Sequence, residues 1–520
     1  MTCVKKQRKF AIYEITTVLI KITKLQTKIL LVQMRDKFQF TDEVIQELFG
    51  YEDAESESVD RLKAYFIKNN AYERMRSDLP VRILVGHKGT GKSALFKVAM
   101  SEDRDTSNLP IMIRPDDIAE LGRSDENFLL KIKQWKWGLT KIIGEKVLAE
   151  FAIDPNQYSN KLGQFGLKLL NFISDTLTVV KDNLQLDATQ HHLIEKFLED
   201  KKIIVYIDDL DRGWEGKKDD ILRISALLNS IRDMANDNPG IRFKVSLRSD
   251  VYYLVRTADE STDKVEGSVV WCSWTNHEIL VLLIKRIQSY FNNKIDEGVL
   301  MRSQQKHISS FLDEVIEHKF HDWKRKDEVP TYQVLMSMVR KRPRDIVKLC
   351  TMAAREAQNQ KMNIINSDHF KAIFEEYSQG RIQDTINEYR SELPSISDLL
   401  FGMRPNRKER DCGRGFIYTT VELRNKLNNL RQNKTFTFKN GTIASADDLI
   451  HFLYKINFLT ARKLLDNGTI QRKYFEENRY ISSGRINFGY DWEVHPVFRW
   501  ALQPEGIDNI LMMFKNHSLD

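Results

Sequence analysis

Short apolar runs alternate with helix-forming stretches over the first half of the chain. Val81–Val85 is a mostly apolar, β-branched run that predicts a buried strand, and residues 94–100 contain good helix formers without a breaker and predict a helix. Similar short runs predict further strands at residues 109–113, 203–207 and 243–247. The alternation predicts an α/β fold in which helices sandwich a parallel sheet.

The pattern changes twice in the second half. Apolar residues recur at helical spacing in Asn276–Phe291, and residues 309–320 and 332–340 continue this pattern, so we expect a helical lid. After residue 393, two capped helical stretches are followed by β-like runs at 472–481 and 485–494 around Ser482-Ser483-Gly484. Helices followed by a hairpin predict a winged-helix-like domain, a fold that serves either for DNA binding or as a packing or dimer module.

These changes divide the 520 residues into four parts: an N-terminal extension (1–40), an α/β core (41–272), the helical lid (273–392) and the winged-helix-like domain (393–520). In the extension, Glu14 interrupts the apolar core that a signal peptide needs, and lysines break any spanning helix. We therefore expect no transmembrane segment. The extension forms an amphipathic surface helix or a helix packed on the core, or translation begins at Met34.

Composition adds two expectations. The formal net charge of +7, with a pI near 8.9, permits contact with nucleic acid without requiring it. The four cysteines lie far apart, without CxxC or zinc spacing, which suits a reducing compartment. We expect a cytoplasmic protein.

The chemistry of the core centres on Gly86–Ser93, which reads GHKGTGKS and fits the phosphate-binding loop (P-loop) pattern G-x-x-x-x-G-K-[ST]. Its glycines let the backbone approach a phosphate chain, and the following helix offers free amides and a positive dipole end. Lys92 would reach the β- and γ-phosphates, and the Ser93 hydroxyl would bind Mg²⁺. The residues predicted to bind the nucleotide are Gly86, His87, Lys88, Gly89, Thr90, Gly91, Lys92, Ser93 and Ala94.

A second motif follows the apolar run 203–207, where the chain reads Asp208-Asp209-Leu210-Asp211-Arg212. A buried parallel strand would carry Asp208 beside the P-loop, where it would hold the Mg²⁺ shell. Asp209 would polarise the attacking water as general base. An NKxD match at Asn293–Asp296 follows a helix instead of a strand, and no DxxG follows the acids, so we expect ATP and not GTP.

Two arginines are candidates for contacting the γ-phosphate. Arg248 ends the run 243–247, a strand expected between the loop strand and the acid strand, and either senses the phosphate or pairs with a neighbouring acid. Arg344, with Arg342 as second choice, lies in a basic turn where a lid would return to the nucleotide; a solvated turn is the alternative.

The order of P-loop, intervening strand, IIVYIDDLDR, VSLRSD and a helical region resembles the P-loop ATPases of the KAP and STAND groups, over roughly residues 50–380. The Asp-Asp-Leu-Asp-Arg ending is most similar to KAP-type proteins, although this chain lacks the membrane helices that many of them carry. The resemblance implies an ATPase of the ASCE type, with ATP and Mg²⁺. Related bacterial ATPases are associated with phage defence and DNA-related stress, usually beside an effector.

Two functional hypotheses follow. In the first, the chain is a regulatory ATPase switch, part of a homo-oligomer in which a neighbour supplies an arginine, and it controls a partner effector. In the second, it is a DNA-stimulated ATPase of DNA repair or maintenance whose C-terminal domain binds duplex phosphates through Arg407, Lys408 and Arg410.

Overall fold

The computed structural model describes residues 39–503 except 107, 123–126, 151–201, 259–262, 323–326, 412–414, 467–469 and 479–488. The expectations for the N-terminal extension and for the loop Ser482–Gly484 therefore lie outside the described residues. No helix within the described ranges combines the length and the apolarity needed to cross a bilayer.

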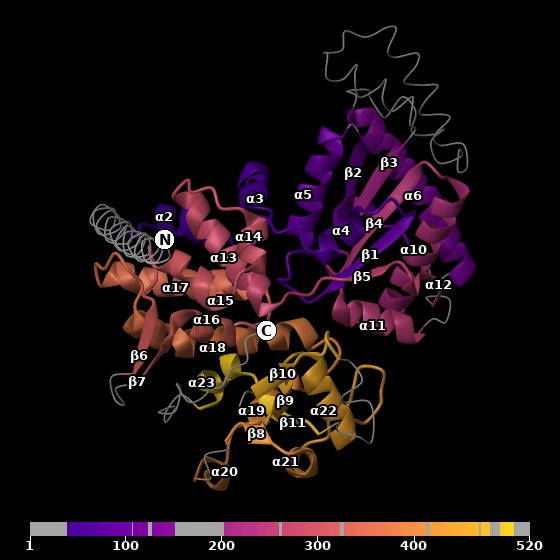
Figure 1. Cartoon of the computed structure of the whole chain (residues 1–520). Coiled ribbons are helices and arrows are strands. Elements are labelled where there is room, and N and C mark those ends of the chain that lie inside the picture. The colour runs from indigo at the N-terminus through magenta and orange to yellow at the C-terminus, as the bar shows by residue number, and fades with distance from the viewer. Residues whose placement is uncertain are drawn as a thin grey trace, which may run out of the picture.

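A five-stranded, fully parallel sheet forms the core, in the order β2-β3-β4-β1-β5. The strand that carries Arg248 lies between the loop strand and the acid strand, as predicted, and its last residue is level with Gly86. The carboxyl ends of these strands therefore meet at one edge of the sheet (Figure 1). The strands are β1 (Val81–Gly86), β2 (Leu109–Ile113), β3 (Ile203–Ile207), β4 (Ile241–Arg248) and β5 (Val269–Trp271).

Helices cover both faces of the sheet, because successive strand residues point to opposite sides. In β1, Ile83 and Val85 belong to a core shared with one set of helices, whereas Leu84 belongs to the core on the other face. The first face is covered by α6 (Phe128–Glu150), α10 (Lys218–Asp237) and α11 (Ser249–Ala258), and the second by α4 (Asn70–Arg76) and α5 (Lys92–Asp105). The prediction of a parallel sheet sandwiched by helices is confirmed.

The lid lies beside this sandwich and is continuous with its second core. The N-terminal helices α2 and α3 pack on lid helix α13, so residues before the P-loop join core and lid. One part of the lid differs from prediction: β6 (Lys319–Asp322) and β7 (Asp327–Pro330) pair antiparallel where a helix was expected to reach residue 320. The helices are α2 (Asp42–Phe49), α3 (Val59–Tyr65), α13 (Asn276–Tyr290), α14 (Glu297–Arg302), α15 (Gln305–Ile308), α16 (Thr331–Ser337), α17 (Pro343–Asn359) and α18 (Ser367–Tyr389).

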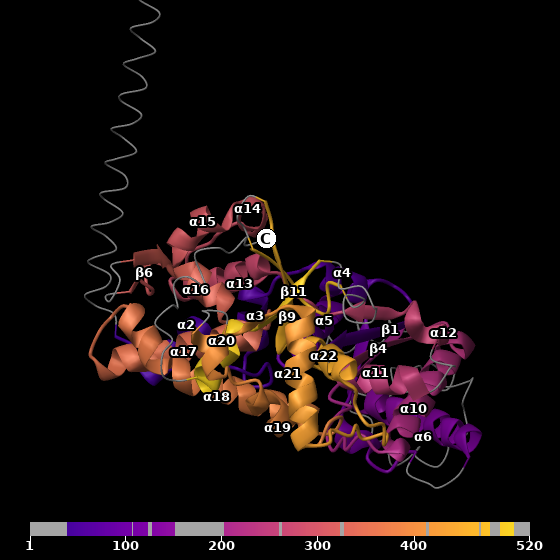
Figure 2. The ribbon, with the colours of Figure 1, turned by 90° about the horizontal axis from the view of Figure 1, so that it is seen from below.

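Residues 396–502 form the C-terminal module, in which helices pack on a four-stranded antiparallel sheet of order β10-β9-β11-β8. Figure 2 shows the module lying across both the lid and the sheet-containing core. The predicted capping boxes at Thr419 and Ser445 are present. The elements are α19 (Ile396–Gly402), α20 (Arg407–Asp411), β8 (Ile417–Tyr418), α21 (Thr420–Asn433), α22 (Ala446–Lys455), β9 (Leu459–Leu464), β10 (Ile470–Lys473), β11 (Asp491–Val494) and α23 (Arg499–Leu502).

The described outer ends of the predicted hairpin between residues 472–481 and 485–494 do not pair as expected, and residues 479–488 lie outside the described residues. β10 and β11 each pair with β9, on its opposite sides, and not with each other. The sequence interpretation missed β9 because this strand begins four residues after α22 ends and reads as a continuation of the helix.

Candidate nucleotide site

The P-loop has the backbone shape that close approach to phosphate requires. Gly89 and Gly91 adopt φ of +82° and +88°, values that residues with a Cβ rarely reach. Gly91 caps the N-terminus of α5, which starts at Lys92. Within the described chain, no acceptor takes the N–H groups of Gly89, Gly91 or Ser93. These amides and the dipole of α5 form an anion site.

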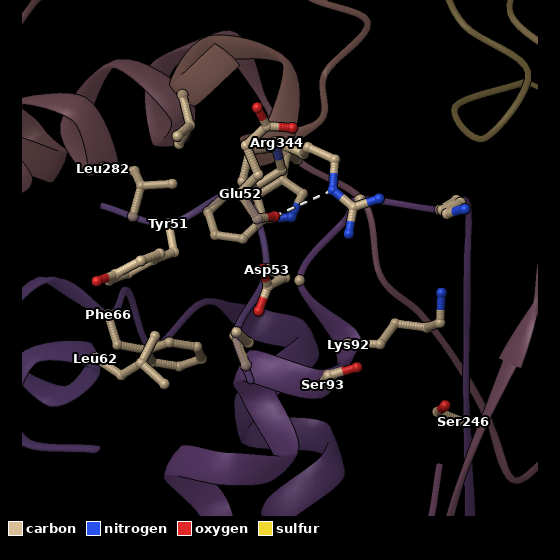
Figure 3. A pocket seen from close by; sticks show the side chains of 18 of the residues that line it. Tyr51, Glu52, Asp53, Leu62, Phe66, Lys92, Ser93, Ser246, Leu282 and Arg344 are labelled. Carbon is tan, nitrogen blue, oxygen red and sulfur yellow. Dashed lines mark hydrogen bonds between the residues drawn. The ribbon is translucent and has the colours of Figure 1, made fainter. Parts of the chain in front are cut away.

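The Lys92 and Ser93 side chains lie in the pocket beside this loop (Figure 3). Lys92 Nζ donates to the carbonyl oxygens of Gly86 at 3.0 Å and His87 at 3.2 Å. The ammonium group therefore contacts carbonyl oxygens of the loop itself. Ala94, also predicted here, lines the same pocket.

The tandem acids reach this pocket from the end of β3. Asp208 Oδ1 accepts from the Asp209 N–H at 2.9 Å and from the Ser246 hydroxyl, which fixes the carboxylate. Its other oxygen, Oδ2, accepts from no group of the described chain, which fits a hard-oxygen ligand for a cation or its water shell. Ser246, on β4, was missed by sequence reasoning, although the strand that carries it was correctly predicted.

Asp209 has an unusual backbone and an unusual environment. Its φ of +61° is uncommon for a residue with a Cβ. Burial raises the pKa of its carboxyl group, and the neighbouring Asp211 and Asp208 raise it further. Arg212 Nη2 lies 3.3 Å from its Oδ2. A carboxylate of raised pKa in a pocket is a better proton acceptor than an ordinary aspartate.

Arg248 follows the alternative in which it pairs with acids. Its guanidinium donates to Asp250 at 2.9 Å, to Asp211 at 3.1 Å and to the carbonyl of Glu388 at 2.8 Å. Burial lowers the pKa of Arg248, but Asp250 and Asp211 outweigh burial and raise the pKa above its usual range. The side chain lines the pocket, yet its donors tie β4 to α11 and to the end of α18.

The two lid arginines have different positions. Arg344 lines the pocket, its N–H donates to the Gly89 carbonyl at 3.3 Å, and its Nε donates to the Glu52 carbonyl at 3.1 Å (Figure 3). Arg342 is buried and donates to the Lys88 carbonyl at 3.2 Å and to Glu388 at 2.9 Å. Arg344 thus faces the nucleotide pocket, whereas Arg342 holds the P-loop backbone from outside it.

Two P-loop side chains point away from the pocket. His87 is buried against Tyr389 and Ser249, and the Thr90 hydroxyl donates to the His87 carbonyl at 2.9 Å. Only the backbone of these two residues can serve a nucleotide. The Lys88 side chain is exposed and lines the pocket, while its N–H donates to Glu388 at 3.0 Å.

The other half of the pocket is apolar and was not predicted. Figure 3 shows Tyr51, Leu62, Phe66 and Leu282 grouped on the side opposite Lys92 and Ser93, in a cavity of about 190 Å³. These residues come from the loop after α2, from α3 and its end, and from α13. They lie up to 231 positions apart in sequence, so no local pattern could have grouped them.

Fold and site together define the class of the chain, whose core is that of a P-loop ATPase. The P-loop follows β1, the acids follow β3, and β4 lies between these strands. A family model described as the FunZ-associated C-terminal helical domain matches residues 277–386, from α13 to α18.

The chain is also similar to individual proteins. It is 22% identical over 487 residues to the putative transposon gamma-delta 80.3 kDa protein of Escherichia coli K12, a match that covers 82% of this chain and 64% of that relative. This chain therefore spans less than two thirds of the relative's length.

Two solved structures are similar in overall course. The Walker-type ATPase of Pyrococcus abyssi has 13% identity and a TM-score of 0.42, and the match covers 84% of this chain and 95% of that one. The Aeropyrum pernix ORC2 protein, an ADPNP–ADP complex, has 12% identity and a TM-score of 0.39, with 86% and 94% covered.

Proposed function

We propose that the chain binds ATP with Mg²⁺ and hydrolyses it at this pocket. The observation that carries the proposal is the convergence of Lys92, Ser93, Asp208 and Asp209 on one cavity at the carboxyl ends of β1 and β3. In this proposal the N–H groups of residues 89–94 cradle the phosphates, and Lys92 leaves the loop carbonyls for the β- and γ-phosphates.

The apolar half of the pocket fixes the direction in which ATP would lie. The adenine base would pack among Tyr51, Leu62, Phe66 and Leu282, and the triphosphate would run towards Lys92. Arg344 lies between the two halves, where its guanidinium would contact the phosphates.

Hydrolysis would then follow from the acids. Ser93 and Asp208 would hold Mg²⁺, which neutralises charge on the phosphate oxygens. Asp209 would accept a proton from the attacking water. The water oxygen would bond to the γ-phosphorus while the bond from that phosphorus to the leaving ADP oxygen breaks. Because Arg248 is occupied by Asp250 and Asp211, a further arginine would come from Arg344 or from a second copy of the chain.

The test is ATP turnover by the purified chain, measured as phosphate release, beside Lys92→Ala and Asp209→Asn. We expect turnover by the wild type, loss of turnover and weaker ATP binding for Lys92→Ala, and loss of turnover with retained binding for Asp209→Asn. Asp237→Asn is a matched control that should keep turnover, since Asp237 is exposed at the end of α10 and lies outside the pocket. Absence of ATP binding by the wild type would overturn the proposal.

The biological role is proposed at the level of a conformational switch. The P-loop contacts the C-terminal module through His87 and the lid through Lys88. These contacts support such a role, because a nucleotide bound at the P-loop would act on both of the other parts. The resemblance to KAP-type ATPases supports a homo-oligomeric, cytoplasmic regulator that acts on a partner effector, in a setting such as phage defence.

A second candidate is DNA binding by the C-terminal module, which would then act as a winged-helix-like domain. The observation in its favour is α20, which exposes Arg407, Lys408 and Arg410 on the part of the module farthest from the core (Figure 1). A solved structure with related overall course, the Aeropyrum pernix ORC1 protein in complex with DNA, has 11% identity and a TM-score of 0.30, with 84% of this chain and 92% of that one covered.

A further inference from the structure

The side chain of His87, the second residue of the P-loop motif, enters a buried cluster built by three parts of the chain. Its Nδ1 lies 2.6 Å from the Tyr389 hydroxyl at the end of α18 and 3.0 Å from the Ser249 hydroxyl at the start of α11. Its Nε2 is hydrogen-bonded to Glu476 of the C-terminal module. The imidazole is 5% exposed, so these contacts exclude solvent.

The charge of Glu476 decides how this cluster is bonded. Burial would raise the pKa of Glu476, but His87 and the Asn457 amide outweigh burial and hold the pKa at about 2. An ionised carboxylate only accepts, so the His87 Nε2–H donates to it, while Nδ1 lies within hydrogen-bond distance of the Tyr389 and Ser249 hydroxyls. Asn457 Nδ2 donates to both Glu476 oxygens, at 3.0 and 3.2 Å.

Lys88, the next residue of the P-loop, is hydrogen-bonded through both its N–H and its carbonyl group. The Lys88 N–H donates to Glu388 Oε1 at 3.0 Å, and the Lys88 carbonyl accepts from Arg342 at 3.2 Å. Arg342 and Glu388 are themselves 2.9 Å apart and nearly inaccessible to solvent. The first half of the P-loop is therefore fixed by α18, by the turn before α17 and, through His87, by the C-terminal module.

The side chains behind the P-loop are closely packed. The cavity between His87, Thr90, Asn457 and Glu476 measures about 20 Å³, room for roughly one water molecule. Close-packed groups pass a displacement on instead of absorbing it. Phosphate binding needs the amides that follow Lys88 to converge, so a shift of His87 or Lys88 changes the anion site directly.

We propose that His87 and Glu476 are positioning residues, through which the docked C-terminal module holds the P-loop in its phosphate-binding shape. By thermodynamic linkage, bound ATP then stabilises the docked state of the module by the same free energy by which docking favours ATP binding. This inference rests on the proposed function, since it assigns a second control to the same ATP site.

The first test compares ATP dissociation constants of the wild type, Glu476→Gln and Glu476→Ala by titration calorimetry. We expect Glu476→Ala to weaken ATP binding about tenfold, and Glu476→Gln to weaken it less, because its amide oxygen still accepts from the His87 N–H. In turnover the loss should fall on KM while kcat at saturating ATP stays near that of the wild type.

Glu477→Gln is the matched control for this series. Glu477 lies one position further along, in the same module, but its carboxylate pairs with Lys341 of the lid and not with the P-loop. We expect its ATP affinity to remain within about twofold of the wild type. Thermal unfolding of each variant without nucleotide checks that the module still folds.

The second test measures the reverse direction by hydrogen exchange with and without ATP. In the wild type, ATP should slow exchange in the segments around Asn457 and Glu476, and in Lys92→Ala at the same ATP concentration it should not. Unchanged affinity in a folded Glu476→Ala variant, or unchanged exchange in a wild type that binds ATP, would overturn the inference and leave the proposed function standing. A wild type that binds no ATP would overturn the proposed function instead.

Discussion

At the scale of single residues, Asp209 combines a chemical role with a backbone constraint. A φ of +61° costs Gly nothing and is adopted at times by Asn and Asp, whose short polar side chains bond locally, but in other residues it brings the Cβ too close to the following carbonyl oxygen, at a cost of about 1–2 kcal/mol. We therefore expect Asp209→Gly and Asp209→Asn to match or exceed the wild type in free energy of unfolding. Asp209→Ala should be about 1 kcal/mol less stable than Asp209→Gly.

Urea unfolding followed by tryptophan fluorescence measures these differences, and phosphate release measures the chemistry in parallel. All three variants should lose turnover, so that stability and activity separate. Equal stability of the Ala and Gly variants would show that Asp209 does not hold this backbone conformation in solution.

The candidate site residues that the structure brings together in one pocket are those of local motifs. Lys92, Ser93, Asp208 and Asp209 line the pocket because each motif is read from a strand and the turn that follows it. Ser246 and the apolar residues that line the other half of the pocket were missed, since they belong to no motif. The contacts of His87 with Glu476 and of Arg248 with the Glu388 carbonyl could not be predicted for another reason, since these partners lie 389 and 140 positions away.

At the scale of elements, α20 and α22 make opposite contributions to any DNA contact. α22 is mostly buried and exposes Asp447 and Asp448 in its first turn, so a duplex that approached this helix would meet negative charge. α20 instead exposes Arg407, Lys408 and Arg410. Contact with DNA would therefore run through α20 and phosphates, without reading of bases by α22.

This geometry predicts the salt dependence of DNA binding. Replacing Arg407, Lys408 and Arg410 together by Ala should weaken duplex binding and lower the slope of log K against log salt by about three. Fluorescence anisotropy with a labelled duplex at several salt concentrations measures both quantities. The matched control removes the same charge from exposed lid residues Lys306, Arg355 and Lys361 and should leave the slope unchanged. Equal effects of the two triple variants, or no binding by the wild type at low salt, would rule out this second candidate.

Among the elements, the distinctness of the local pattern decided what the sequence could predict. Periodic helices such as α13 and α21 and the buried strands β1 and β3 were identified because their pattern repeats or stands out from its flanks. Strands of four to six residues in the lid and the C-terminal module were missed or paired wrongly. The order β10-β9-β11 depends on contacts across the sheet, which no run of residues displays.

At the scale of the whole molecule, the C-terminal module joins core and lid through buried ionisable groups. Glu476 contacts His87 of the core and Glu477 contacts Lys341 of the lid, while Glu493 is enclosed with Arg472 and Arg499 inside the module. The sequence predicted the parts in order along the chain, but not this docking, since buried charges look like surface charges until their partners are known. The stability of the assembly should therefore depend on pH through groups that were not singled out from the sequence.

His495 provides the clearest case. It is buried, Val497 N–H donates to its Nδ1 at 3.2 Å, and its Nε2 lies 3.1 Å from the Tyr474 hydroxyl. Burial, together with the nearby Arg340 and Arg472, lowers the pKa of His495 from 6.5 to about 3. In the unfolded chain the imidazole of His495 is protonated below about pH 6.5, whereas in the folded chain it is protonated only below about pH 3. The free energy of unfolding therefore falls as the pH falls from 6.5 to 3.

We expect the free energy of unfolding to drop between pH 7 and pH 5, with a contribution from His495 of up to about 2 kcal/mol at pH 5. His451 and His369, whose pKa values burial also lowers, add to the same trend. The depressed pKa values of Glu476 and Glu493 act later, since the stability they confer is lost only below about pH 4.5. His495→Asn keeps an acceptor for the Val497 N–H and should flatten the dependence between pH 7 and 5, whereas replacing the exposed His307 by Asn should not. Urea unfolding of the three proteins at both pH values measures the difference, and equal slopes for all three would show that His495 does not remain neutral in the folded chain.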